Sequence, residues 1–166
     1  MNQTYMLSTW VKAPRLKNSV IAIVAACLPY VNQKLFKEIA KDKEVLLACP
    51  EREPQLHYGK LASIIRSSKP KELHIYTIEG SPHCFTLHAS ANEAEYILGE
   101  KIEKRHFVIV DAEKLVEINP DTIRVARYLH IVNELIKKNP EVLEELQKHS
   151  LEYKLSKILT KKLKTY

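Results

Sequence analysis

Glycine is scarce in this chain. There are three glycines in 166 residues, where average usage near 7% predicts about 12. The sequence contains neither a G-x-G-x-x-G loop nor a G-x-x-x-x-G-K-[ST] loop, and the glycines of such loops let the backbone approach a phosphate closely. We therefore expect no dinucleotide cofactor and no P-loop chemistry.

Long apolar runs are also missing. The longest, Val20–Leu28, ends at Pro29 and is far shorter than the roughly 20 residues that cross a bilayer. The first 17 residues lack the order of a secretory signal, in which a charged stretch precedes an apolar one. We expect a cytoplasmic protein with no membrane span.

Cysteine is present only three times, at Cys27, Cys49 and Cys84. An odd, widely spaced set differs from the dense even sets of disulfide-stapled secreted domains, so we expect reduced thiols. The abundance of lysine, glutamate and isoleucine resembles the composition of proteins from thermophiles.

The positive charge is concentrated at one end of the chain. Residues 148–166 contain six lysines and one acid, Glu152, and so carry +5 of the net charge of +6. A basic helix can bind nucleic acid or an acidic surface. A solvated helix face is the favoured interpretation, because no arginine-rich or aromatic base-reading element lies beside it.

Apolar runs and amphipathic stretches alternate along the chain. Four runs predict strands, and two shorter segments, Thr4–Val11 and Lys114–Ile118, would add a fifth and a sixth. Helical patterns separate the strands, and this alternation predicts a mostly parallel sheet between two helical layers. The expected fold is a three-layer, Rossmann-like α/β domain with a C-terminal helical extension. The four main strands are Val20–Cys27, Val45–Cys49, Leu73–Ile78 and His106–Asp111.

Two helices are expected after the sheet. Asn119-Pro120-Asp121 begins one that runs to about Lys138, and Asn139-Pro140-Glu141 begins the last. We place the domain boundary there, with an α/β domain over residues 1–138 and a basic amphipathic helix over 139–166. Leucines four residues apart from Leu151 to Leu163 form a stripe that would pack on the domain or pair two subunits in a homodimer.

All three cysteines follow predicted strands. Cys27 and Cys49 end their apolar runs, and Cys84 follows the third run across Gly80-Ser81-Pro82. The carboxyl ends of parallel strands meet at one edge of an α/β sheet, where such folds bind ligands. The three thiols would therefore converge and bind zinc or an iron–sulfur cluster, with His57, His83, His88 or an outside group as fourth ligand.

Cys84 also has the features of a nucleophile. Ser81 as N-cap and Pro82 at the first helical position predict a helix over 82–98, ended by Gly99. Cys84 would then lie in the first turn, where the helix dipole lowers a thiol pKa.

Three histidines and a serine complete this expected site. His88, four residues after Cys84, or His57 would act as the base. A cofactor phosphate at this helix start would meet Ser81 and His83.

Three hypotheses follow. The leading one is a metal or iron–sulfur protein with a redox or sensing role, built on Cys27, Cys49 and Cys84. The second is a cysteine-dependent enzyme of the sulfur- or acyl-transfer type with Cys84 as nucleophile. The third is a noncatalytic module whose basic last helix binds a partner, nucleic acid being the less favoured one. The substrate would be a small molecule or a redox partner protein.

Overall fold

The computed structural model describes residues 4–53 and 57–163, and of residues 57, 58 and 161–163 the backbone only. The chain divides into two units, Met1–Arg124 and Val125–Tyr166. No helix within the described residues is long and apolar enough to cross a membrane.

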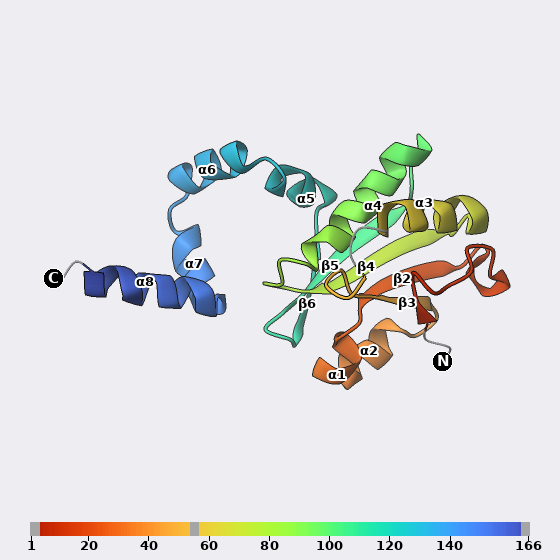
Figure 1. Ribbon diagram of the computed structural model, residues 1–166, viewed down its shortest axis with the longest axis horizontal. Coiled ribbons are helices and arrows are strands. Elements are labelled where there is room, and N and C mark those ends of the chain that lie inside the picture. Colours follow the sequence, from red (N-terminus) through yellow and green to blue (C-terminus); the bar gives the residue numbers. More distant parts are fainter. Residues whose placement is uncertain (1–3, 54–56, 164–166) are drawn as a thin grey trace. The chain divides into compact units, whose positions relative to one another are not determined.

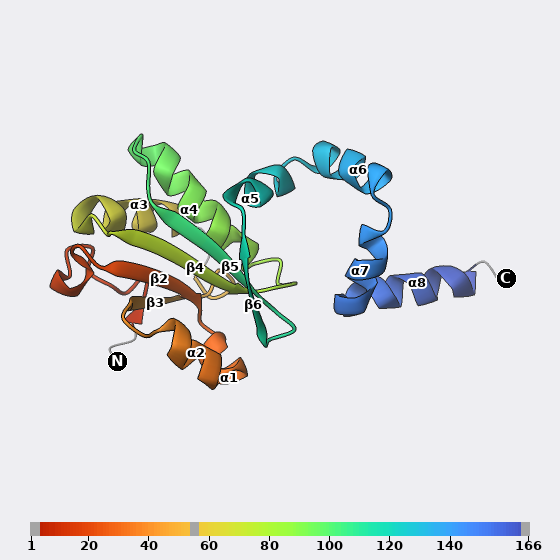
Figure 2. The same ribbon diagram turned by 180° about the vertical axis from the view of Figure 1, so that it is seen from behind.

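A single six-stranded sheet organises the first unit (Figures 1 and 2). Its strand order is β1-β3-β2-β4-β5-β6. Neighbouring strands are parallel except for β5 and β6, which pair antiparallel. The strands are β1 (Thr4–Tyr5), β2 (Val20–Ala25), β3 (Glu44–Ala48), β4 (Glu72–Ile78), β5 (Lys104–Val110) and β6 (Lys114–Ile118).

Helices cover both faces of this sheet (Figure 1). The longer helices α3 (His57–Ser68) and α4 (Phe85–Leu98) pack on one face, and the short helices α1 (Leu28–Val31) and α2 (Gln33–Ile39) pack on the other. A 3-10 turn, η1 (Pro14–Leu16), precedes β2. The predicted three-layer α/β fold is confirmed, with six strands in the sheet.

The central strands are apolar on both sides because both sides are covered. In β2, Ile21 and Ile23 belong to the core under α3 and α4, while Ala22 and Val24 belong to the core under α1 and α2. A strand buried on both faces needs a continuous apolar run, with no polar alternation. This is why its sequence alone identified it.

The strand predicted over Thr4–Val11 is much shorter than expected. Only Thr4 and Tyr5 pair with β3. The chain then turns, since the backbone N–H of Ser8 and the side-chain hydroxyl of Thr9 both donate to the carbonyl of Tyr5, at 3.1 and 2.8 Å. The period-2 pattern therefore reflected the packing of a turn.

The helix predicted over 82–98 starts three residues late. Its observed N-cap is Cys84, and Gly99 ends it in the left-handed conformation at φ 64°, as the sequence predicted. Ser81 does act as a cap, because its Oγ accepts from the backbone N–H of Cys84 at 3.4 Å. It caps a separate turn before the helix, so the prediction that placed Cys84 in the first helical turn was wrong.

The second unit is wholly helical. The two long helices predicted after the sheet are four in the structure: α5 (Pro120–Ala126), which begins in the first unit, α6 (Leu129–Lys138), α7 (Val142–His149) and α8 (Leu151–Leu163). One break falls at Tyr128, the N-cap of α6, and another at Ser150, whose extended backbone separates α7 from α8. The boundary between the two units falls before residue 138, because α6 buries no residue.

The sheet core sets the stability of the first unit. Ile75 lies on β4, next to the centre of the sheet, and is fully buried. Replacing it by alanine should lower the free energy of unfolding by about 2–5 kcal/mol. Leu115→Ala on β6 is the control, because Leu115 is 38% exposed, and should change stability by less than about 1 kcal/mol. Urea titration followed by circular dichroism measures both, and equal losses would contradict the assigned core.

Candidate functional site

Each cysteine begins a turn that follows a strand of the sheet. The carbonyl of Cys27 accepts from the backbone N–H of Tyr30 at 3.0 Å, and the carbonyls of Cys49 and Cys84 accept from the N–H of the third residue after each, at 3.0 and 3.1 Å. Cys49 directly follows β3 and Cys27 lies two residues after β2, whereas Cys84 lies six residues after β4, just before α4. Their side chains define the thiol cluster (Cys27, Cys49 and Cys84).

The strand order brings these three turns together. The chain passes from β2 to β3 on one side and from β4 to β5 on the other, so the strand order reverses between β2 and β4. Ligands of open α/β sheets bind in the crevice at the carboxyl ends of such a reversal. Cys27 is the N-cap of α1 and Cys84 that of α4, and these helices pack on opposite faces of the sheet. Two of the three thiols thus flank the switch point.

Cys49 is held beside Cys27 by the backbone. The N–H of Ala26 donates to the carbonyl of Ala48 at 3.0 Å, which extends the pairing of β2 with β3 by one residue. Cys27 directly follows Ala26 in the chain, and Cys49 directly follows Ala48.

The electrostatics of Cys27 agree with this arrangement. Burial raises the pKa of Cys27, and Cys84 and then Cys49 raise it further. The sulfurs also differ in access: Cys27 is exposed, Cys49 is half-buried and Cys84 is buried.

The thiol cluster is not a preformed metal cage. Within residues 4–53 and 57–163, no three His, Cys, Asp or Glu side chains are grouped closely enough to hold a metal ion as they stand. The predicted metal ligands are therefore not grouped as a metal site among these residues, and binding one ion would require them to move closer.

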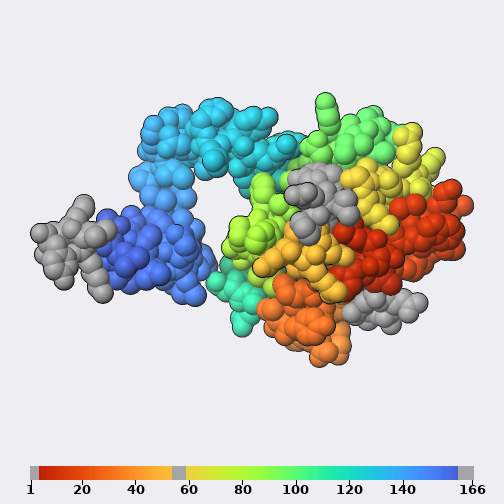
Figure 3. All heavy atoms as spheres, viewed as in Figure 1, coloured from red at the N-terminus to blue at the C-terminus, as the bar shows by residue number. Residues whose placement is uncertain are grey.

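A carboxylate–imidazole pair joins the loops around the thiol cluster. His83 Nδ1 lies 3.8 Å from Oε2 of Glu51, which connects the loop after β4 to the loop after β3. Figure 3 shows these two loops side by side, in yellow-green and orange. Both side chains are more than half exposed. His83 therefore lies at the predicted edge of the sheet, next to Cys84 in the chain.

Two other predicted site residues are placed less fully. His57 is the first residue of α3, but its side chain lies outside the described part of the structure, so its proposed role as base stays a prediction. Ser81 lies in the loop after β4 and accepts from the N–H of Cys84. This contact does not test whether Ser81 binds a phosphate.

His88 points into the interior and is already partnered. Its Nε2 lies 2.7 Å from the hydroxyl of Thr77, and its Nδ1 lies 3.0 Å from Nδ1 of His106. All three side chains are nearly fully buried. Both ring nitrogens are thus engaged by groups other than the Cys84 thiol, so the structure does not bring His88 and Cys84 together as base and nucleophile.

The two buried imidazoles are held neutral. Burial lowers the pKa of His88 to about 4, and burial followed by the proximity of His88 lowers the pKa of His106 to about 3. A contact between two ring nitrogens also needs one of them to accept, which a doubly protonated ring cannot do. The pair is therefore an uncharged structural link between α4 and β5.

More buried polar groups continue along the same contact. Asn92 lies one helical turn after His88 on α4, is 8% exposed, and its amide atoms have no hydrogen-bond partner within the described residues. Further along, Glu95 accepts from the buried ammonium of Lys104 on β5 and from the N–H of Ile102. Two polar contacts thus attach α4 to β5 at separate points along the helix.

Sequence reasoning gave His106 no role, although a signal was present. His106 stands in an apolar strand, and His88 and Asn92 stand on the helix face that periodicity assigns to the core. Polar residues at core positions need partners, and pairing the polar positions of 88–95 with those of 104–106 would have predicted this contact.

A pocket of about 280 Å³ opens near the start of β5, at the opposite edge of the sheet. The cations Lys101, Lys104 and Arg124 line it together with the acids Glu103 and Asp121. Arg124 pairs with Asp121 and with Glu95. These charges largely cancel, so the pocket offers no net attraction for an anion.

Comparison with known proteins gives one match. A family model described as a Rossmann-like domain matches residues 13–164, which covers most of both units. No match was found among curated proteins or among solved structures.

The coupling of the thiols can be measured at Cys27. Replacing both Cys49 and Cys84 by serine removes two of the groups that raise the Cys27 pKa. The pH midpoint for alkylation of Cys27 by iodoacetamide, followed by mass spectrometry, should therefore fall. Ser19→Ala, at the amino end of β2, is the control. An unchanged midpoint in the double variant would show that the thiols do not interact.

The buried histidine pair predicts how stability depends on pH. Because the folded pKa values lie below the ordinary 6.5, the unfolded chain binds more protons as the pH falls through 6.5. Stability is thus fully present above pH 6.5 and is lost on acidification, by about 2 kcal/mol per histidine between pH 6.5 and 5.

The variant His106→Asn checks this. Asparagine keeps an amide near the Nδ1 position but does not titrate, so this loss should be roughly halved. Urea unfolding at each pH gives the slope. His130→Gln, in the exposed part of α6, should leave it unchanged, and an equal slope in both variants would rule out the His88–His106 pair as its source.

Proposed function

Because this chain belongs to the Rossmann-like domain family, we propose that its function lies at the switch point between β2 and β4. There the thiol cluster holds a thiophilic metal ion, zinc or an iron–sulfur centre, and the protein has a redox or sensing role. What supports the proposal is that Cys27, Cys49 and Cys84, separated by 22 and 35 residues in the sequence, each follow one of three neighbouring parallel strands, β2, β3 and β4.

The dinucleotide that such folds often bind does not fit this chain. The turn after β2 contains Ala26, Cys27, Leu28 and Pro29, with no glycine to admit a pyrophosphate. The helix that follows, α1, has only four residues, so few aligned peptide dipoles face the turn. The ligand would therefore be bound by the side chains of this turn.

Thiol electrostatics favour a cation. Burial raises the pKa of Cys27, and the neighbouring Cys84 and Cys49 raise it further, because a thiolate at Cys27 would be repelled by thiolates there. A bound metal ion reverses this effect, since it deprotonates and attracts all three sulfurs. Metal binding would therefore relieve the electrostatic repulsion among the three thiolates.

The exposure of the three sulfurs and the number of ligands limit which metal centre can bind. Cys27 is exposed and gives an ion entry from solvent, whereas Cys84 is buried and shields the other side. Three thiolates complete a tetrahedral zinc site with one further ligand, for which His83, next to Cys84 in the sequence, is a candidate. An iron–sulfur cluster needs a fourth ligand too. The turns after β2 and β3 would have to close around the ion, because the thiols are not preformed as a cage.

Cobalt(II) binding tests the proposal. Thiolate ligation gives cobalt an intense sulfur-to-metal charge-transfer absorption, so the ion reports its own ligands. Titration of reduced protein without oxygen should give one such centre per chain. Each of Cys27→Ser, Cys49→Ser and Cys84→Ser should weaken binding about tenfold or more, since loss of outer-shell groups alone costs that much.

The control for this titration is His130→Gln, an exposed histidine on α6 that should leave binding unchanged. If no charge-transfer band appears, or if only one of the three serine variants weakens binding, the three thiols do not form one metal site.

A second candidate is a cysteine-dependent enzyme of the sulfur- or acyl-transfer type. It is favoured by the Glu51–His83 pair beside Cys84, because a base oriented by a carboxylate can activate a thiol. Since His88 is engaged elsewhere, His83 would serve as the base. His83→Gln would then slow the alkylation of Cys84 at neutral pH, whereas the exposed control His130→Gln would leave its rate unchanged.

A further inference from the structure

The helices α6, α7 and α8 bury none of their described side chains. From Val125 to Thr160, every described residue is exposed or half-buried. Yet these helices are amphipathic, with rows of large apolar side chains on one side. Those that are exposed are Leu129, Ile131, Leu135, Val142, Leu146, Leu151, Leu155, Ile158 and Leu159.

Helices of this length need a surface to pack against. The helices α6, α7 and α8 have 10, 8 and 13 residues, and isolated helices shorter than about 12–15 residues are marginal in water. Most helix stability in proteins comes from burial of the apolar face. An amphipathic unit with no buried residue therefore indicates a missing partner.

The exposed area fits a protein partner. The nine apolar side chains are each between 39 and 78% exposed, which amounts to an apolar area on the order of 800 Å², about what each partner contributes to a standard interface. Single exposed apolar residues need no explanation, but exposed apolar area of this size, gathered on three successive helices, points to an interaction site.

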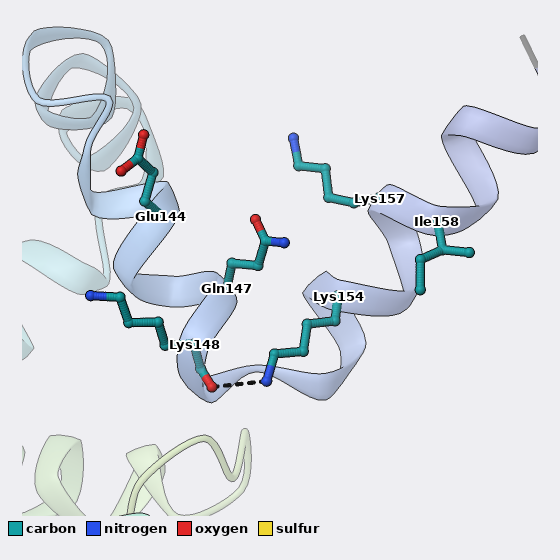
Figure 4. A pocket seen from close by; sticks show the side chains of 6 residues that line it. All are labelled: Glu144, Gln147, Lys148, Lys154, Lys157 and Ile158. Atoms are coloured by element: carbon teal, nitrogen blue, oxygen red, sulfur yellow. Dashed lines mark hydrogen bonds between the residues drawn. The ribbon is translucent and has the colours of Figure 1, made fainter.

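Charge changes along the two last helices. The helix α7 begins with Glu141, Glu144 and Glu145 and ends with Lys148 and His149, while α8 has Glu152 in its first turn and then Lys154 and Lys157. Figure 4 shows Glu144, Gln147 and Lys148 on α7 across a groove of about 510 Å³ from Lys154 and Lys157 on α8. One surface thus presents acids at the start of α7 and lysines on both helices.

Such a surface is complementary to itself. In a two-fold interface the same patch faces its own copy in the opposite direction, so the acids at the start of α7 in one copy meet the lysines of α8 in the other, twice. Nucleic acid would be attracted by α8 but repelled by the acids of α7. The first unit offers no strong counter-charge either, because residues 1–124 contain 17 basic and 15 acidic side chains.

We propose that a second copy of this chain covers the exposed apolar side chains of α6, α7 and α8. Two copies pack these helices about a two-fold axis, with Glu141 and Glu144 of each facing Lys154 and Lys157 of the other and the apolar rows buried between them. This inference is independent of the thiol cluster, and either can fail without the other.

Sedimentation equilibrium of the full chain tests the proposal. The wild type should have twice the mass of one 19.2 kDa chain, and the double variant Leu155→Glu/Ile158→Glu should be monomeric with an unchanged circular dichroism signal from the sheet. Tyr30→Glu is the matched control, since Tyr30 is an exposed apolar residue of the first unit at 89%, and should remain dimeric.

Charge reversal tests the orientation. Glu141→Lys/Glu144→Lys and Lys154→Glu/Lys157→Glu should each weaken the dimer about tenfold or more, and an equimolar mixture of the two should form a heterodimer, because every contact is then again between opposite charges.

Three outcomes would overturn the proposal. The first is a monomeric wild type at every concentration, with Leu155→Glu/Ile158→Glu lowering its melting temperature, which would place α8 on its own chain. The second is a dimer that survives that variant. The third is salt-dependent binding of duplex DNA by a monomer, strengthened by Glu141→Lys/Glu144→Lys.

Discussion

The handedness of strand–helix–strand connections constrains the whole first unit. A right-handed crossover that moves one way along the sheet puts its helix on one face, and a crossover that moves the other way puts it on the opposite face. Because the chain goes from β2 to β3 in one direction and from β4 to β5 in the other, α1 and α4 must diverge around the carboxyl ends of β2 and β4. The thiol cluster lies where they diverge, with Cys27 and Cys84 as the N-caps of these two helices.

The buried polar contacts between α4 and β5 hold the helix in this position on the sheet. The helix is attached near its start by His88 to Thr77 and His106, and near its end by Glu95 to Lys104. Buried polar groups are costly unless paired, so these pairs allow one register of α4 on the sheet and disfavour others. Since Cys84 precedes the first turn of α4, the same contacts fix its position beside the switch point.

The architecture could be predicted from the sequence because each central strand is a continuous apolar run. Val20–Cys27 and Val45–Cys49 needed no partner information to be recognised, and Gly99 marked the end of α4. The start of α4 could not be predicted, because Ser81 and Pro82 are equally suited to begin a helix or a separate turn. The break at Ser150 was obscured by leucines that keep helical spacing across it. The His88–His106 contact joins residues 18 apart on different elements, and such long-range pairs depend on strand order, which a single sequence does not contain.

The central claim is that three cysteines from three separate turns act on one ligand. X-ray absorption spectroscopy of the zinc-loaded protein measures this directly, because the fine structure counts the sulfur neighbours of the metal. The account predicts one zinc per chain with three sulfurs at about 2.3 Å and one lighter ligand at about 2.0–2.1 Å. A zinc surrounded only by nitrogen and oxygen, or by a single sulfur, would contradict it.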